Sequence, residues 1–200
     1  MKRYIVAITG ASGAVLGLRV LETIASQHEV HLVMSPEAMG IMHEEAGVDW
    51  RAATPGGVLE RIRLSLKGPS LSYWDNGDLA APVSSGSFRT DGMIVVPCSM
   101  KTLAGIASGY AENLVQRAAD VTIKEGRTLV LAPREMPLSS IHLENMLKLS
   151  RMGVRIAPPV PAFYQGPENL DEMVDFLAGK LLDSLGVGHS LYKRWEGRKG

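Results

Sequence analysis

Residues 4–34 read YIVAITGASGAVLGLRVLETIASQHEVHLVM, and this stretch decides the fold. Residues 4–8 are nearly all apolar, as in a strand that is buried on both faces of a parallel sheet. A glycine-containing turn follows at 10–13, then apolar residues at helical spacing over 15–24, then a second apolar run at 30–34. Strand, helix and strand form a βαβ unit, whose crossover is right-handed in almost all proteins. The stretch therefore predicts an α/β fold.

The rest of the chain continues this alternation. Further strands are predicted at residues 92–97, 128–132 and 154–156. Further helices are predicted at residues 36–45, from 99–102 onward, 113–125, 139–152 and 170–185. Residues 51–91 are predicted to be irregular, because turn-forming sequences occur at 55–57, 67–69 and 75–78. The order indicates a three-layer α/β/α, Rossmann-like parallel sheet in a single domain, with ligands at the carboxyl ends of the strands. We expect residues 1–186 to form this domain and residues 187–200 to form a tail that contacts a neighbouring subunit or the active site.

Composition and charge exclude several classes of protein. Hydrophobic residues make up 46% of the 200 residues, which is too much for a disordered chain. Lys and Arg number 21, as do Asp and Glu, and this balance argues against a nucleic-acid-binding surface. No apolar stretch is long enough to span a membrane, and the first one is too short for a secretory signal. The single cysteine, Cys98, excludes an internal disulfide and a cysteine-cluster metal site. We expect a cytoplasmic protein.

Small polar residues lie at four predicted strand ends, where ligands bind in this architecture. They are residues 10–13, Ser35, residues 99–102, and Arg134 with Glu135. Backbone N–H groups at a helix start, together with hydroxyl groups, form a phosphate site; alternatively, the glycines only make a tight turn. The dinucleotide fingerprint Gly-x-Gly-x-x-Gly is absent, since the glycines lie at 10, 13 and 17, and no acidic residue ends the second strand. The pattern favours a mononucleotide such as FMN over NAD.

A cationic helix face is predicted within residues 113–125. Arg117 and Lys124 lie two turns apart with Asp120 between them, so the three share one face. They form either a solvated, ion-paired stripe or a site for a dianionic leaving group, which a fixed Arg and a Lys suit. The acidic residues at 171–175 are interpreted as the start of a surface helix and not as a magnesium motif. Cys98 is expected to be a small buried residue, not a nucleophile, and no metal site is predicted.

Six short motifs occur in order along the chain. They are Gly10-Ala-Ser-Gly-Ala14, Ser85-Gly-Ser-Phe88, Pro97-Cys-Ser-Met-Lys-Thr-Leu103, Arg117-Ala-Ala-Asp-Val121, Arg134-Glu-Met-Pro-Leu-Ser139 and Pro161-Ala-Phe-Tyr164. Together they resemble the UbiX/Pad-type flavin prenyltransferases, and the resemblance continues to Arg194-Trp195. Flavin-dependent cysteine decarboxylases of the wider family usually have Pro-Ala-Ser-Ala-Asn-Thr after the third strand, where this chain has Pro97-Cys-Ser-Met-Lys-Thr102. The difference favours the prenyltransferase branch.

The resemblance implies both an assembly and a reaction. It implies a flavodoxin-like, flavin-binding subunit that forms a homododecamer with active sites at subunit junctions. The implied activity is that of a flavin prenyltransferase, which joins the dimethylallyl group of dimethylallyl monophosphate to N5 and C6 of reduced FMN without a metal ion. The product, prenylated FMN, serves UbiD-type decarboxylases.

The resemblance also implies roles for particular residues. Those implied to bind FMN are Gly10, Ala11, Ser12, Ser35, Ser99, Met100, Lys101, Thr102 and Arg134. Those implied to hold the prenyl phosphate are Arg117, Lys124, Tyr164 and Lys180, with Glu135 beside it. The implied catalytic residues are Ser12, Glu45, Lys124 and Glu135, with Glu45 near the flavin in proton transfer. Two positions depart from some relatives, which have Arg in place of Lys180 and Trp in place of Leu79.

Two other functions remain open alongside this one. The first is a flavin-dependent decarboxylase that acts on a cysteine-like carboxylate. The lysines at 101 and 124 argue against this function. The second is a non-catalytic FMN-binding carrier, which would leave Arg117, Lys124 and Lys180 without a purpose unless they are surface charges.

Overall fold

A parallel sheet forms the centre of the molecule in the computed structural model, which describes residues 1–66, 70–195 and 197. Its strand order is β3-β2-β1-β4-β5-β6, and every neighbouring pair is parallel. The strands are β1 (Arg3–Ile8), β2 (Glu29–Met34), β3 (Ser70–Asp75), β4 (Gly92–Cys98), β5 (Leu129–Pro133) and β6 (Arg155–Ile156). This is the doubly wound order, and the predicted fold class is confirmed.

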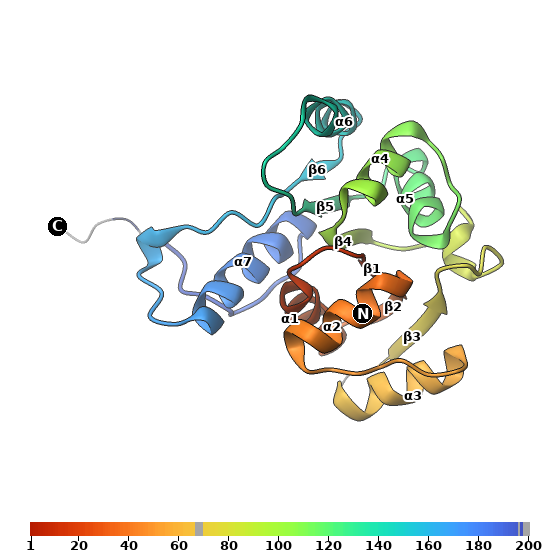
Figure 1. Cartoon of the computed structure of the whole chain (residues 1–200), viewed down its shortest axis with the longest axis horizontal. Coiled ribbons are helices and arrows are strands. Elements are labelled where there is room, and N and C mark those ends of the chain that lie inside the picture. The colour runs from red at the N-terminus through yellow and green to blue at the C-terminus, as the bar shows by residue number, and fades with distance from the viewer. Residues whose placement is uncertain (67–69, 196, 198–200) are drawn as a thin grey trace.

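Helices cover both faces of the sheet (Figure 1). They are α1 (Ala14–Ala25), α2 (Pro36–Ala46), α3 (Pro55–Ser65), α4 (Met100–Ser108), α5 (Leu114–Lys124), α6 (Ser140–Arg151) and α7 (Leu170–Leu185), with short 3-10 helices η1 (Pro82–Ser84) and η2 (Phe163–Gln165). Side chains alternate along a strand, so neighbouring residues belong to different cores. Val6 belongs to the core that also contains residues of α1, α2, α3 and α7, and Ala7 belongs to the core that contains residues of α4, α5 and α6. The two cores make a three-layer α/β/α structure.

The switch point of the sheet lies between β1 and β4. The chain winds from β1 toward β3 on one side and from β4 toward β6 on the other, which opens a crevice at the carboxyl ends of the two central strands. Thr9, which follows β1 and is 1% exposed, joins the two strand ends. Its hydroxyl donates to the carbonyl oxygen of Pro97 (2.9 Å) and accepts from the N–H of Ser99 (2.8 Å). These two hydrogen bonds hold the ends of β1 and β4 together at the base of the crevice.

The prediction that residues 51–91 are irregular is wrong, because this segment contains α3 and β3. The sequence at 55–57 begins a helix: Pro55 takes its first turn, and the Thr54 side chain accepts from the N–H of Gly57 at 3.2 Å. In β3 only alternate residues, Leu71 and Tyr73, are buried, and Ser72 lies between them. The predicted turn at 75–78 is confirmed by the N–H of Gly77, which donates to the Asp75 carboxylate at 2.8 Å. The predicted turn at 67–69 lies outside the described residues.

The described part of the tail folds back onto α7. The carboxylate of Asp183 accepts from the Tyr192 hydroxyl (2.6 Å) and from Nη2 of Arg194 (2.7 Å), and it lies 3.1 Å from Nε2 of His189. Burial opposes ionisation of Asp183, but the hydrogen bonds from Arg194 and Tyr192 lower its pKa to about 2. Residues 187–195 are therefore attached to the domain, while residues 196 and 198–200 of the predicted tail lie outside the described residues.

Replacing Asp183 with Asn is expected to destabilise the protein by about 1–2 kcal/mol, since it removes charged hydrogen bonds that are partly open to solvent. The lowered pKa means that the folded state binds this proton less readily than the unfolded state. The contribution is therefore present above the unfolded-state pKa of about 4 and is lost as the pH falls toward 2. Thermal unfolding midpoints at pH 7 and pH 3 check this. An equal gap between wild type and Asp183→Asn at both pH values would contradict it.

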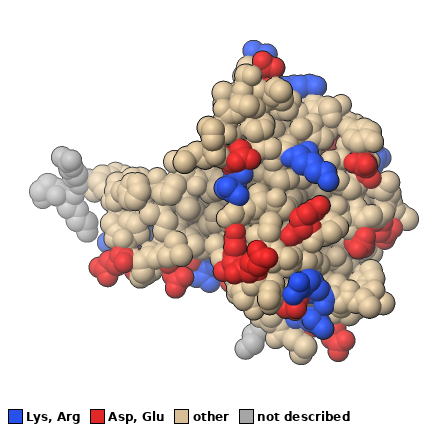
Figure 2. Space-filling model, viewed as in Figure 1, with Lys and Arg blue, Asp and Glu red and all other residues tan. Residues whose placement is uncertain are grey.

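None of the helices in the described ranges has the length and apolar character needed to cross a bilayer. On the face that Figure 2 shows, acidic and basic side chains are interspersed, in keeping with equal counts of the two charges.

Candidate functional site

A cavity of about 380 Å³ lies at the carboxyl ends of β1, β2 and β4. We call it the carboxyl-edge cavity. Five of the predicted FMN-binding residues line it: Gly10, Ser35, Ser99, Lys101 and Thr102. Residues from the ends of three strands thus meet at one place, as the strand-end pattern predicts.

Three helices begin at this cavity. Ser35 caps α2 by accepting from the N–H of Ala38 (3.3 Å), and Ser99 caps α4 by accepting from the N–H of Thr102 (3.3 Å). Asn113 caps α5 through its side-chain oxygen, which accepts from the N–H of Gln116 at 3.0 Å. Helix N-termini carry a partial positive charge and unpaired N–H groups, so the arrangement suits a phosphate.

The N-terminus of α1 is used differently. Oε2 of Glu45 accepts from the N–H groups of Gly13 and Ala14, both at 2.8 Å. A carboxylate of the chain therefore takes the position in which a doubly wound fold often binds phosphate. In this structure the N–H groups of Gly13 and Ala14 are therefore bonded to Glu45, and the FMN-binding role of residues 10–13 stays a prediction.

Ser12, Glu45 and Arg134 lie around this turn. Nε of Arg134 donates to the carbonyl oxygen of Ser12 at 3.2 Å, although the two residues come from different strand ends. The Ser12 side chain is exposed, whereas the neighbouring Ala11 is 8% exposed. The structure thus brings together two predicted catalytic residues and a predicted FMN-binding arginine.

The cationic face predicted on α5 is present and ion-paired. Nη1 of Arg117 lies 2.9 Å from Asp120, and its Nε donates to the carbonyl oxygen of Ser84 at 3.1 Å. Nζ of Lys124 lies 2.7 Å from the carboxylate of Glu125. The hydrogen bond from Lys124 lowers the pKa of Glu125. Both cations keep more than a third of their side-chain surface exposed, so a ligand can reach them.

Tyr164 and Lys180 lie elsewhere in the same chain. They line a second cavity, of about 280 Å³, whose walls include Pro158 and Phe176. This cavity is beside α7, on the face of the sheet opposite to α5. Within one chain, therefore, the four predicted phosphate-binding residues form two pairs and not one site.

Two predicted residues make few contacts of their own. Glu135, which follows β5, is exposed, and its carboxylate accepts from the N–H of Met136 at 3.0 Å. Met100 is half-buried in the first turn of α4. Their predicted roles depend on a bound ligand or a neighbouring chain.

Sequence reasoning missed Thr9, Glu37 and Asn76 at the carboxyl-edge cavity. Each follows a strand directly or begins the helix after it, and a polar residue in that place was the available signal. Asn76 joins the β3 end to α5: its carbonyl oxygen accepts from Leu114 N–H (2.8 Å) and its side chain from Val115 N–H (3.2 Å).

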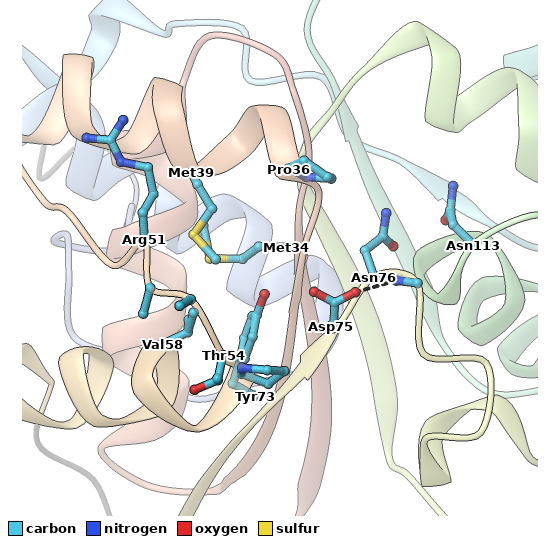
Figure 3. A pocket seen from close by; sticks show the side chains of 14 residues that line it. Met34, Pro36, Met39, Arg51, Thr54, Val58, Tyr73, Asp75, Asn76 and Asn113 are labelled. Atoms are coloured by element: carbon cyan, nitrogen blue, oxygen red, sulfur yellow. Dashed lines mark hydrogen bonds between the residues drawn. The ribbon is translucent and has the colours of Figure 1, made fainter.

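A third cavity, of about 510 Å³, adjoins the carboxyl-edge cavity and shares Pro36, Asn76 and Asn113 with it (Figure 3). Tyr73 points its hydroxyl between Met34, Met39 and the carboxylate of Asp75 in this view. Burial, with the charge of Asp75, raises the pKa of Tyr73 to about 12. The hydroxyl stays protonated at neutral pH.

Cys98 and the acidic residues at 171–175 lie where the sequence predicts them, in the core and at the start of a helix. Cys98 is 0% exposed, and burial raises the pKa of its thiol to about 12, so it does not act as a thiolate. Asp171 lies in the first turn of α7, and Asp175 pairs with Arg19 through two hydrogen bonds of 2.5 and 3.0 Å. Within the described ranges, no three His, Cys, Asp or Glu side chains are placed to share a metal ion.

Comparison with known proteins gives matches over nearly the whole chain. The Flavoprotein family model matches residues 1–182. Flavin prenyltransferase UbiX from Methanocaldococcus jannaschii is 45% identical over 193 residues, which are 96% of this chain and 98% of that protein. A probable UbiX-like flavin prenyltransferase from Escherichia coli O157:H7 is 51% identical over 98% of this chain and 93% of its own length.

Solved structures of UbiX-type proteins are also similar to this chain over nearly its whole length. AnUbiX (PadA1) in complex with FMN and dimethylallyl pyrophosphate has a TM-score of 0.86 at 45% identity, covering 99% of each chain. A dodecameric FMN-dependent UbiX-like decarboxylase from Escherichia coli O157:H7 has a TM-score of 0.85 at 50% identity, covering 98% of this chain and 100% of that one. An FMN-dependent cysteine decarboxylase from thioviridamide biosynthesis is only 15% identical, with a TM-score of 0.59 over 93% of this chain and 99% of its own. That likeness shows the fold alone.

Proposed function

The chain belongs to the UbiX-type flavin prenyltransferases of the Flavoprotein family, and from this we propose how its residues divide the reaction. The enzyme adds a dimethylallyl group to reduced FMN and so makes the prenylated FMN that UbiD-type decarboxylases use. The observation that carries this function is 45% identity over 98% of the length of a flavin prenyltransferase. The decarboxylase and carrier alternatives are not favoured.

The carboxyl-edge cavity holds the phosphate of FMN in this proposal. The N–H groups at the start of α4 and the ammonium group of Lys101 bind the phosphate oxygens, while Ser99 and Thr102 keep the helix start in shape through a 3.0 Å hydrogen bond between their hydroxyls. Gly10 and Ser35 line the same cavity, Ala11 follows Gly10 in the chain, and Met100 begins α4. Ser12 and Arg134, which are joined by a hydrogen bond, would bind the flavin ring.

Ser12 and Glu45 move protons at the flavin ring. When bound, reduced FMN supplies the nucleophilic atoms N5 and C6. Oε2 of Glu45 is held by two N–H groups, which leaves Oε1 to take up the proton that ring closure releases. Ser12, one residue before Gly13 and exposed, relays that proton to solvent.

Arg117, Lys124, Tyr164 and Lys180 hold the phosphate of the prenyl donor, which we propose is dimethylallyl monophosphate. Phosphate is a poor leaving group, and fixed cations with a tyrosine hydroxyl stabilise the charge that develops as the C–O bond breaks. Glu135 lies beside the phosphate in this proposal. Since the two pairs lie on opposite faces of the sheet in one chain, the site takes α5 from one subunit and the α7 cavity from another.

Subunits therefore share each site, and we propose a homododecamer, as the Escherichia coli relative is described. Residues 1–186 are the flavin-binding domain, and the tail from residue 187 supplies subunit contacts, with Trp195 67% exposed. We place the enzyme in the cytoplasm, where FMN and its decarboxylase partner are available.

A mixing experiment tests the shared site. Lys124→Ala and Lys180→Ala enzymes, each nearly inactive, are dissociated, mixed and reassembled. Because the lesions enter a shared site from different subunits, roughly a quarter of the sites become wild type, and activity rises well above that of either parent. Arg117→Ala mixed with Lys124→Ala is the matched control: both lesions lie on α5, so no wild-type site forms. No gain in the first mixture, with subunit exchange shown by mass spectrometry, would contradict a shared site.

The direct test of function is anaerobic incubation with reduced FMN and dimethylallyl monophosphate. The flavin is expected to gain one C5 unit in mass.

A further inference from the structure

Glu37 lines the carboxyl-edge cavity, although no motif assigns it a role. It lies in the first turn of α2, two residues after the cap Ser35, and shares the cavity with Lys101. An acidic residue inside a phosphate site is unexpected, because like charges repel. Its position and charge therefore need an explanation.

The side chain of Glu37 folds over Gly10. A Cβ at Gly10 would lie 2.8 Å from Cβ of Glu37 and 3.8 Å from its Oε2. Glycine at position 10 thus lets the first turn of α2 approach the end of β1. The carboxylate therefore lies on the wall of the cavity next to the end of β1.

Glu37 carries its charge at neutral pH. Hydrogen bonds from its own backbone N–H and from Ser35, together with the nearby charge of Lys101, lower the pKa of its carboxyl group. The carboxylate of Glu37 thus lies in the first turn of α2, beside its own N–H group and the Ser35 side chain that caps the helix. The start of α4 is left for the phosphate, with the charge of Glu37 across the same cavity.

We propose that Glu37 weakens binding of the flavin phosphate and so speeds the departure of flavin from the enzyme. The inference rests on the proposed phosphate site. Flavin is consumed and released in every turnover of this enzyme, so binding energy that holds FMN and prenylated FMN equally would slow release without aiding chemistry. A carboxylate facing the phosphate removes part of that energy.

Glu37→Gln keeps the shape of the side chain and removes its charge. The variant is expected to bind FMN about two- to fivefold more tightly, the size of one partly exposed charge interaction, through slower dissociation. Quenching of flavin fluorescence measures Kd, and stopped-flow displacement measures the off-rate. The matched control is Glu44→Gln, an exposed glutamate on the same helix outside the cavity, which leaves FMN binding unchanged.

Riboflavin, which lacks the phosphate, tests whether Glu37 acts on the phosphate or on the rest of the flavin. Glu37→Gln should bind riboflavin as wild type does, and its gain for FMN should shrink with added salt. An unchanged or weaker affinity for FMN, or an equal gain for riboflavin, overturns the role of Glu37. If instead wild type and variant both fail to bind FMN, the phosphate site itself is wrong.

Discussion

Replacing Lys124 by alanine is expected to lower kcat by about 10²–10³-fold while leaving FMN affinity within about twofold, the pattern of a lost transition-state contact. The ammonium group of Lys124 is 2.7 Å from Glu125 and remains nearly half exposed, so it can turn to the leaving phosphate. The lysine lies on α5, away from the residues that line the carboxyl-edge cavity. Steady-state turnover and FMN titration check the two halves of the prediction.

Two variants accompany Lys124→Ala. Lys148→Ala removes an exposed lysine near the end of α6 and should leave turnover unchanged. Glu135→Ala should slow turnover without loss of FMN binding, because Glu135 is placed beside the prenyl phosphate. If Lys124→Ala and Glu135→Ala both lose FMN binding, the residues belong to the flavin site and their proposed roles are wrong.

Replacing Gly17 by alanine is expected to cost about 2–3 kcal/mol of folding stability, because the added methyl group has no room. A Cβ there would lie 2.5 Å from the carbonyl oxygen of Val96 and 3.3 Å from side-chain atoms of Ile8. A backbone atom cannot move aside as a flexible side chain can, so α1 would shift away from β4. The turn that Glu45 binds would shift with it.

Gly40 is the matched control for Gly17. It lies in α2, and a Cβ there would meet nothing within 4 Å. Gly40→Ala should raise stability by up to about 1 kcal/mol through helix propensity. Thermal unfolding at equal protein concentration compares the two. Equal shifts of the same sign would show that close packing of α1 on β4 is not the reason for the glycine at 17.

The sequence was informative where physical patterns are strong and local. The short apolar runs at residues 4–8 and 128–132 predicted buried strands, which β1 and β5 confirm, and the helix predicted at 170–185 matches α7. The edge strand β3 escaped notice because one face is polar, and α3 because its first turn, Pro55-Gly-Gly57, has the composition of a loop. Helix starts and turns use the same residues, so local composition does not separate them.

At the site, the sequence predicted which residues lie at strand ends, but it did not predict which residues contact one another. Ser35 and Ser99 follow strands, and parallel strands end at one edge, which brings the two residues together. The contact of Glu45 with Gly13 spans 32 residues and depends on the angle at which α2 packs. Likewise, nothing local in Lys124 or Lys180 tells which face of the sheet each will occupy. The family resemblance, confirmed by the comparisons, supplied the reaction, which local pattern could not.

The central claim is tested most directly by mass spectrometry of the flavin. The enzyme is incubated anaerobically with reduced FMN and dimethylallyl monophosphate, with Lys124→Ala in parallel. We predict a flavin heavier by one C5 unit with wild type and little of it with the variant in the same time. Unmodified FMN after incubation with wild-type enzyme that demonstrably binds FMN would contradict the account.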